Sequence, residues 1–160
     1  MAPLKRKGDL AELKVAADLM ERGYGIAVPW SEDSDFDLIA YRDHELHRVQ
    51  VKYTESDGRI VTVRCNSHSL TNGKIKQTKH YTARTIDWIA VWDRTSDRCY
   101  YVPACELGNG RYVISLRLVP ALNCQRARVR FAEAYLDFGP ARQLEMEPAG
   151  FEPATSNLQS

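Results

Sequence analysis

Three polar residues near the middle of the first half of the sequence carry side chains that can bind a metal ion and a phosphate group. Asp37 opens one apolar segment, and Gln50 and Lys52 alternate with Val49 and Val51 in the next one. Successive side chains of a strand point to opposite faces, so Gln50 and Lys52 share one face. If the two segments pair, Asp37 joins them, and an acid, an amide and a lysine converge beside an apolar core. Such a combination suits a divalent cation and a phosphate.

A β-hairpin over residues 36–53 has to position these side chains. The segments 36–40 and 49–53 are predicted as strands, and the charged residues 41–45 lie in the turn between them. The alternative interpretation is a surface hairpin whose charges are solvated in the ordinary way.

A helix is predicted over residues 9–22, with Gly8 as its N-cap and Gly23 as its C-cap. Apolar residues at three- and four-residue spacing indicate its buried face. That stripe consists of Leu10, Leu13, Ala17 and Met20.

Glu12 is the fourth candidate for the site, because it lies on the flank of this helix that also carries Val15, Ala16 and Leu19. Its carboxylate therefore leans toward the core, where an acid needs a metal ion or a charged partner. The alternative is that Glu12 extends into solvent or pairs with a neighbouring lysine.

The remaining sequence predicts an α/β fold, with one mixed sheet flanked by helices. Further strands are expected over residues 24–28, 59–64, 86–92, 98–103 and 112–118, a loop over 66–73, and a final helix over 129–138. We expect residues 1–138 to form one domain, since 160 residues suffice for a sizeable core. Residues 139–160 contain few core-forming residues, which predicts a disordered tail.

Two basic segments, residues 74–84 and 126–130, are candidates for contact with a nucleic-acid backbone. The first contains no acid and includes an aromatic residue, a combination that suits phosphates. The net charge of the chain is only +1, so such a surface must be local, and a solvated face is the alternative. The expected DNA contacts are Lys7, Lys74, Lys76, Lys79, Tyr81, Arg126, Arg128 and Arg130.

The composition limits where the protein can act. The four cysteines form no C-x-x-C pair and stand at no zinc-binding spacing, which indicates free thiols in a reducing compartment. The first seven residues are charged but lack the apolar core of a signal peptide, and no apolar run reaches membrane length. We therefore expect a cytoplasmic protein without a membrane partner.

The chain resembles the PD-(D/E)XK nuclease superfamily in three features taken together: the helix with an inward Glu12, the strand acid Asp37 and the pair Gln50-x-Lys52. The run from Lys7 to Leu38 is also similar to archaeal Holliday-junction resolvases. A closer resemblance is to the group I intron-encoded homing endonucleases of this fold, from bacterial tRNA introns. It covers about residues 5–138, and the segments that carry it are Val49 to Tyr53, Ile86 to Val91 with Cys99 to Pro103, and Leu116 to Leu118 with Ala132 to Tyr135.

The resemblance implies a nuclease that cuts double-stranded DNA with Mg²⁺ or Mn²⁺. In that family pattern Asp37 and the backbone carbonyl of Val51 ligate the metal, Glu12 acts through a metal-bound water, and Lys52 positions the attacking water and the phosphate. Gln50 stands where the superfamily usually has an acid, although the homing-endonuclease subgroup carries the same Gln. Because each chain offers one such site, cutting both strands implies a homo-oligomer, either a dimer or a tetramer.

Three other functions remain open from the sequence. The chain can be a structure-selective nuclease for four-way junctions, which would share the same helix and metal site. It can be a catalytically inactive DNA-binding relative, with Gln50 as the sign of a lost activity. It can also be a structural protein in which Glu12, Asp37 and Lys52 form an ion-pair network.

Overall fold

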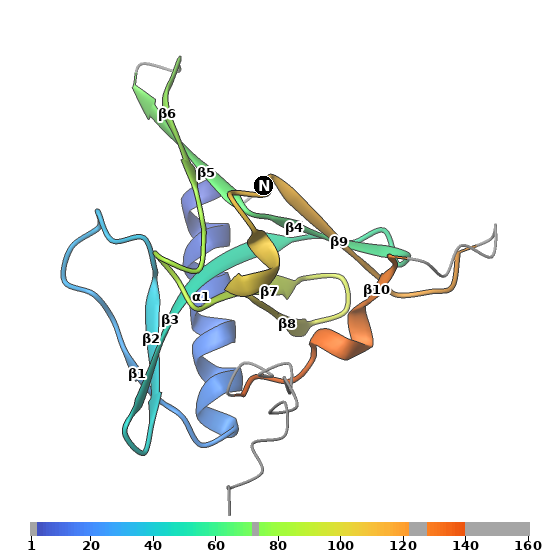
Figure 1. The fold of residues 1–160 in the computed structure, drawn as a ribbon, viewed down its shortest axis with the longest axis horizontal. Helices are drawn as coiled ribbons and strands as arrows, with labels where there is room; N and C mark the ends of the chain where they lie inside the picture. Colours follow the sequence, from blue (N-terminus) through green and yellow to red (C-terminus); the bar gives the residue numbers. More distant parts are fainter. Residues whose placement is uncertain (1–2, 72–73, 122–127, 140–160) are drawn as a thin grey trace, which may run out of the picture.

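A five-stranded mixed sheet lies at the centre of the fold (Figure 1) in the computed structural model, which describes residues 3–71, 74–121 and 128–139. Its order is β1-β2-β3-β7-β8, with β3 and β7 parallel and every other pair antiparallel. The strands are β1 (Gly25–Ala27), β2 (Leu38–Arg42), β3 (Glu45–Thr54), β7 (Trp88–Asp93) and β8 (Arg98–Pro103). The predicted α/β fold with a mixed central sheet is confirmed.

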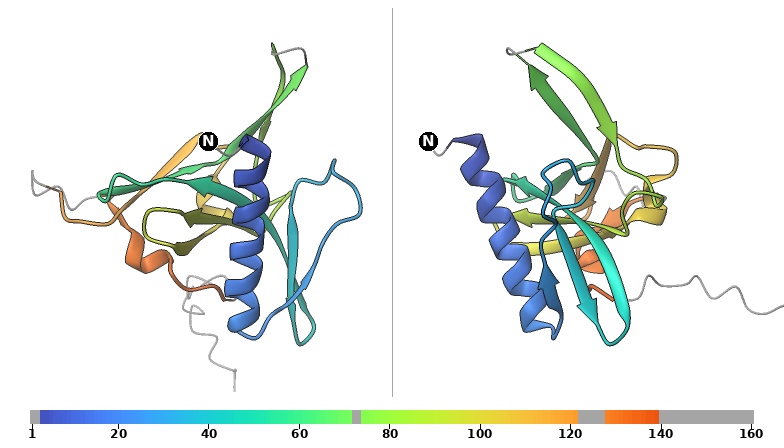
Figure 2. Two further views of the ribbon diagram at one scale, coloured as in Figure 1. Left: turned by 180° about the vertical axis from the view of Figure 1, so that it is seen from behind. Right: turned by 90° about the vertical axis from the view of Figure 1, so that its left-hand side faces the viewer.

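The helix α1 (Leu4–Glu21) covers one face of this sheet (Figure 2). It begins after Pro3, so the predicted N-cap Gly8 lies inside the helix instead. Its predicted C-terminus is right: Gly23 has φ 86°, a conformation that glycine adopts without strain, and donates its N–H to the Met20 carbonyl at 2.9 Å.

The buried face of α1 differs from the prediction. Ala11, Val15 and Leu19 are fully buried against the sheet, whereas Leu13 and Met20 of the predicted stripe are 69% and 62% exposed. Both sets have helical spacing, and the choice between them depends on which face meets the sheet. The flank that carries Glu12 is the buried side, as predicted.

A second sheet covers the opposite face of the central sheet. Its order is β10-β9-β4, formed by β4 (Ile60–Arg64), β9 (Val113–Arg117) and β10 (Arg130–Phe131). Val61, Val63, Ile114 and Leu116 pack from it against the outward faces of β7 and β8. Because both faces of β7 are covered, all six of its residues are buried. A strand that is covered on both faces needs apolar residues throughout, and this continuous apolar run is what predicted a buried strand here.

A two-stranded ribbon of β5 (Asn66–Thr71) and β6 (Lys74–His80) projects away from the body of the molecule (Figure 1). The predicted loop over residues 66–73 is therefore wrong for most of that range. The loop between β1 and β2 rises on the same end of the molecule, as does the start of α1 (Figures 1 and 2). The loop and the ribbon flank the candidate site.

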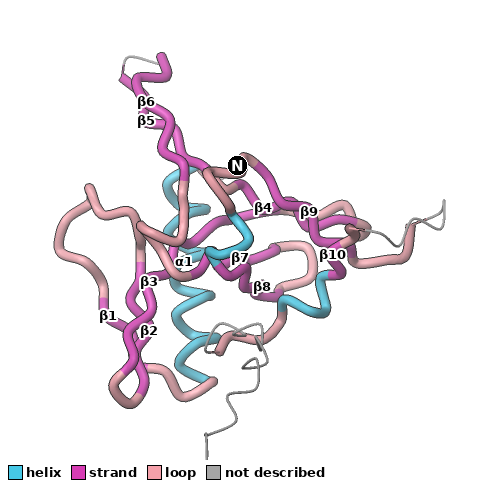
Figure 3. The backbone as a smooth tube through the Cα atoms, in the orientation of Figure 1, coloured by secondary structure: helices cyan, strands magenta, loops and turns pink. Residues whose placement is uncertain are grey.

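The predicted helix over residues 129–138 is also wrong. This segment forms β10 and then a short 3₁₀ turn, η2 (Ala132–Tyr135), like η1 (Ala104–Leu107) earlier in the chain. In the described residues, α1 is therefore the one long helix (Figure 3). Phe138 follows η2 and returns to the core beneath α1.

Several predictions fall on residues outside the described part of the chain. The expected disordered tail lies there from residue 140 onward, as does Arg126. Cys65, Cys99 and Cys105, which are described, are free thiols. None of the described helices combines the length and apolarity needed to cross a membrane.

Candidate functional site

The pairing of β2 with β3 brings Asp37 and Gln50 together. Leu38 pairs with Val49 in the antiparallel ladder, so the positions on either side of that pair, Asp37 and Gln50, face each other. The Gln50 amide nitrogen donates to Asp37 Oδ2 at 2.5 Å, and the Val51 backbone N–H donates to the same oxygen at 2.8 Å. The predicted convergence of these two side chains is therefore present.

Gln50 lies between two oxygen atoms that could bind a cation. Its side chain is 7% exposed, and its amide nitrogen donates to Asp37 and, at 3.3 Å, to the backbone carbonyl of Val51. Among the described residues, Gln50 and Asp93 are the buried polar or charged side chains. A carboxylate and a carbonyl that share one donor point at a common position, and oxygen ligands of this kind suit Mg²⁺.

The site has few carboxylates for a metal centre. No group of three or more His, Cys, Asp or Glu side chains within the described residues is arranged to hold a metal ion. A cation here would rely on Asp37, the Val51 carbonyl and the Gln50 amide. Rotation of the Gln50 amide exchanges the positions of its nitrogen and oxygen, so that the oxygen can face the cation. Mg²⁺ commonly keeps several waters and takes only one or two protein carboxylates, so this donor set fits it.

Lys52 lies on the same face of β3, two residues after Gln50. Burial lowers the pKa of Lys52, and the negative charge of Asp37 opposes this effect. Its ammonium lies 4.9 Å from the centre of the Tyr81 ring, a cation–π contact that favours the charged form. Tyr81 is itself held in place, because its hydroxyl donates to Ser67 Oγ at 3.0 Å.

Glu12 approaches this group from α1. Its side chain is half-buried, and burial raises the pKa of Glu12 to about 7, with the charges of Asp37 and Asp9 adding to the effect. Burial likewise raises the pKa of Asp37, against the opposing bonds from Val51 and Gln50 and the charge of Lys52. Two carboxyl groups that resist ionisation beside each other would gain from a shared cation.

A pocket opens directly over Asp37, Gln50 and Lys52. One wall comes from the loop between β1 and β2, and the other from the β5–β6 ribbon. Lys79 joins the two walls, with its ammonium 2.7 Å from Asp35 and 3.2 Å from the Asp33 carbonyl. The wall residues, which the sequence did not single out, are Glu32, Asp33, Ser34, Ser67, His68 and Gln77.

The predicted DNA contacts occupy different positions in the structure. Lys74 and Lys76 lie on the projecting strand β6, and Arg128 is exposed. Lys7 pairs with Glu55 at 2.9 Å, and Arg130 pairs with Glu106 at 2.8 Å. The basic segment that precedes η2 thus has at least one charge already neutralised within the fold.

Tyr81, another of the predicted DNA contacts, lines the pocket. It is only 4% exposed, and it contacts Lys52 and Ser67. These contacts assign it to holding Lys52 in place. Because Ser67 belongs to β5 and Tyr81 follows β6, this contact connects the ribbon with the lysine of the site.

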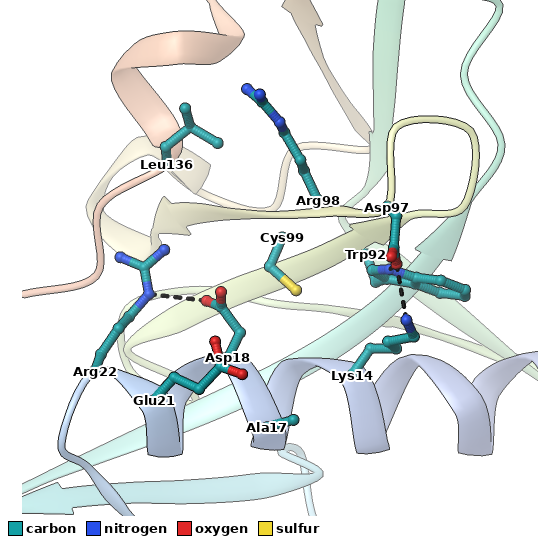
Figure 4. Close-up of a pocket in the computed structure, with 10 residues that line it drawn as sticks. All are labelled: Lys14, Ala17, Asp18, Glu21, Arg22, Trp92, Asp97, Arg98, Cys99 and Leu136. Atoms are coloured by element: carbon teal, nitrogen blue, oxygen red, sulfur yellow. Dashed lines mark hydrogen bonds and ion pairs between the residues drawn. The ribbon is translucent and has the colours of Figure 1, made fainter.

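A second hollow lies between α1 and β8, away from Asp37 (Figure 4). Four of its charged side chains pair with one another: Arg22 with Asp18 at 2.8 Å, and Lys14 with Asp97 at 2.9 Å. Asp18 also accepts a hydrogen bond from Tyr101 at 2.5 Å. The Lys14–Asp97 pair and the Tyr101–Asp18 bond fasten α1 to the sheet and its β7–β8 turn, so we interpret the hollow as structural.

The comparisons with known proteins agree with this geometry. The chain matches the family model of the PD-(D/E)XK endonuclease over residues 3–138. Its fold is similar to that of a solved bacterial homing endonuclease, I-Ssp6803I, with a TM-score of 0.64 and 21% sequence identity, over 84% of this chain and 88% of that one. No curated protein matches the chain.

Proposed function

The chain belongs to the PD-(D/E)XK endonuclease family, and from this premise we propose that it is a Mg²⁺-dependent enzyme that cuts both strands of DNA at a specific site, as homing endonucleases do. The observation that carries the proposal is the convergence of Asp37, Gln50 and the Val51 carbonyl on one position, with Lys52 beside it. Mn²⁺ could replace Mg²⁺, since both take oxygen ligands.

Each group then has a defined task in phosphodiester hydrolysis. Bound Mg²⁺ supplies a water of lowered pKa and neutralises charge on the phosphate. Asp37, the Val51 carbonyl and the Gln50 amide oxygen would hold the ion, and Glu12 would act through its water shell. Lys52, oriented by the Tyr81 ring, positions the attacking water and the scissile phosphate.

The ribbon beside the pocket suits a DNA duplex as substrate. A two-stranded ribbon is of a size that enters the major groove of B-DNA. The β5–β6 ribbon projects beside the pocket and carries Lys74 and Lys76, which would meet phosphates along the groove. The scissile phosphate would then lie at the foot of the ribbon, above Asp37 and Lys52.

We also propose that the enzyme acts as a homo-oligomer in the cytoplasm. Each chain supplies one site of this kind, and two cuts on opposite strands need two sites with matching symmetry. A dimer satisfies that requirement, and a tetramer contains two such pairs.

The experiment that tests the proposal is cleavage of DNA that carries the intronless insertion site, with Mg²⁺ and with EDTA. Double-strand cutting in Mg²⁺ only, lost in Asp37→Ala, is expected. Asp43→Asn is the matched control, because Asp43 is an exposed acid in the turn of the same hairpin.

Three other results would contradict the proposal. Tight binding without cutting in any metal would identify an inactive DNA-binding relative. Preferential cutting of a four-way junction over the linear site would identify a structure-selective nuclease. Cleavage by Asp37→Ala at the wild-type rate would remove Asp37 from the site.

A further inference from the structure

Trp30 is the most exposed large apolar side chain in the described part of the chain, at 104% of its reference area. It lies in the loop between β1 and β2, two residues after Val28, which is 69% exposed. Trp88 and Trp92 are by contrast only 5% and 4% exposed. An indole in full contact with water loses the burial that usually stabilises this side chain, which suggests that it is buried against a partner.

The loop that carries Trp30 forms one wall of the catalytic pocket. It runs directly into Asp37, and Glu32, Asp33 and Ser34 line the pocket together with Asp37. The ribbon forms the opposite wall. The bonds of Lys79 to the loop fix the distance between the two walls, so that both flank whatever the pocket binds.

The charge of this loop is wrong for binding phosphates. It contains Glu32, Asp33 and Asp35, and the ion pair with Lys79 neutralises only Asp35. If this loop lay along the DNA backbone, the phosphates would repel its carboxylates. Its contact with DNA must therefore be apolar, and Trp30 and Val28 supply that surface.

The position of the loop determines which groove it faces. The backbone of a duplex separates its major and minor grooves, and the scissile phosphate is part of that backbone. If the ribbon enters the major groove on one side of the pocket, the loop on the other side faces the minor groove. Apolar side chains that enter the minor groove partly unstack a base step and bend the DNA.

We propose that Trp30 enters the minor groove beside the cleaved bond and unstacks a base step there. The inference rests on the proposed function, since it needs a duplex in the pocket. It assigns part of the site preference to the deformability of that step, because pyrimidine–purine steps unstack more easily than others. Trp30 thus contributes to specificity without a hydrogen bond to any base.

The first test uses the fluorescence of the wild-type protein. Since Trp88 and Trp92 are buried, acrylamide quenches Trp30 selectively. Adding target duplex in EDTA should protect this emission from acrylamide, and 2-aminopurine placed beside the cut should brighten as its stacking is lost. If Trp30 emission is instead protected from acrylamide without DNA, and this protection increases with protein concentration, Trp30 lies in a subunit interface. That result would overturn the proposal.

The second test compares cleavage by variants in Mg²⁺. Trp30→Ala should lose about tenfold or more in kcat/KM on the target, since no side chain then compensates for the lost stacking of the base step. Trp30→Phe should retain most activity because it keeps an apolar ring. Leu46→Ala, at an exposed position near the turn of the β2–β3 hairpin, is the matched control.

The outcomes separate this inference from the proposed function. A wild-type protein that cuts no DNA in Mg²⁺ defeats both. A wild-type protein that cuts, together with a Trp30→Ala variant of equal rate and unprotected emission, defeats only the role of Trp30.

Discussion

Gln50 donates to both oxygen groups that would ligate the metal, so its amide lies where these two oxygens point. Gln50→Glu would put a second carboxylate 2.5 Å from Asp37 Oδ2, where like charges repel each other. We expect this variant to melt at a lower temperature in EDTA and to bind Mg²⁺ about tenfold more tightly, since ligand charge sets affinity.

Isothermal titration with Mg²⁺ and thermal unfolding with and without the ion measure both effects. Gln50→Met is the control of similar size, and it should weaken Mg²⁺ binding instead. Equal affinity in all three proteins would show that the amide is not a ligand.

The raised pKa of Glu12 predicts how the stability of the fold depends on pH. Its pKa is raised to about 7 in the folded protein, above the ordinary value of 4.5, so its ionisation destabilises the fold. The stability linked to Glu12 is therefore fully present below that ordinary value and is lost as the pH rises through about 7.

Glu12→Gln removes this dependence. We expect it to match the wild type in melting temperature at about pH 5 and to exceed it at about pH 8 in EDTA, while cleaving DNA poorly. Thermal unfolding at the two pH values checks this. Glu21→Gln, an exposed position on the same helix, should show no such crossover.

At the scale of elements, the proposed contact between the ribbon and DNA gives a prediction about binding. Replacing Lys74 and Lys76 with Gln should weaken DNA binding and lower the slope of log K against log salt by about two, one for each phosphate that the variant leaves without a cation. Fluorescence anisotropy across a salt series measures the slope. Lys14→Gln is the control, because Lys14 pairs with Asp97 on another face. An unchanged slope would remove the ribbon from the interface.

Asp93 joins the end of the β3 segment to the turn between β7 and β8. The carboxylate is fully buried and accepts bonds from Ser56 Oγ and Ser96 Oγ, both at 2.7 Å. Burial by itself raises the pKa of Asp93, but these bonds outweigh it and lower the pKa. Asp93→Asn should cost about 2 kcal/mol of unfolding free energy at neutral pH.

The pH dependence of that difference has a defined sign. A carboxyl with a lowered folded pKa stabilises above its ordinary value of 3.8, and this contribution is lost as the pH falls through the folded pKa. Urea unfolding of wild type and Asp93→Asn should therefore differ less in acid than at neutral pH. A constant difference would mean that the charge of Asp93 does not matter.

At the scale of the whole molecule, Phe138 joins the last described segment of the chain to the core beneath α1. Its ring lies 4.9 Å from the rings of both Tyr24 and Trp88 and 5.1 Å from that of Tyr101. Phe138→Ala should lower the unfolding free energy by about 3 kcal/mol, as expected for a buried aromatic residue. Phe131→Ala, at a position that is 43% exposed, should cost clearly less in the same urea titration.

The sequence predicts the centre of this molecule better than its periphery. Asp37, Gln50 and Lys52 can be placed because strand alternation fixes which side chains share a face, and the buried partner strand β7 has an unbroken apolar run. The buried flank of α1 is only half predicted, because the helix has two apolar stripes and the sheet selects the one with smaller residues, Ala11 among them.

The ribbon and the end of the chain cannot be predicted in the same way. The sequence of the ribbon has only two apolar residues, Leu70 and Ile75, so its clearest local signal is Asn72-Gly73, a dipeptide favoured in hairpin turns. The spacing of Val129, Ala132 and Leu136 fits a helix, yet parallel pairing of Arg130 with Leu116 holds the start of that segment extended. Such long-range pairing leaves no trace in a local pattern.

The position of Phe138 also has a consequence for how the protein is made. A ribosome delivers the chain from its N-terminal end, so α1 and the first strands emerge long before this ring. The aromatic cluster beneath α1 closes only when Phe138 arrives. The helix that carries Glu12 packs on this cluster, so we expect the nascent chain to become competent to cut DNA only after residue 138 has left the ribosome.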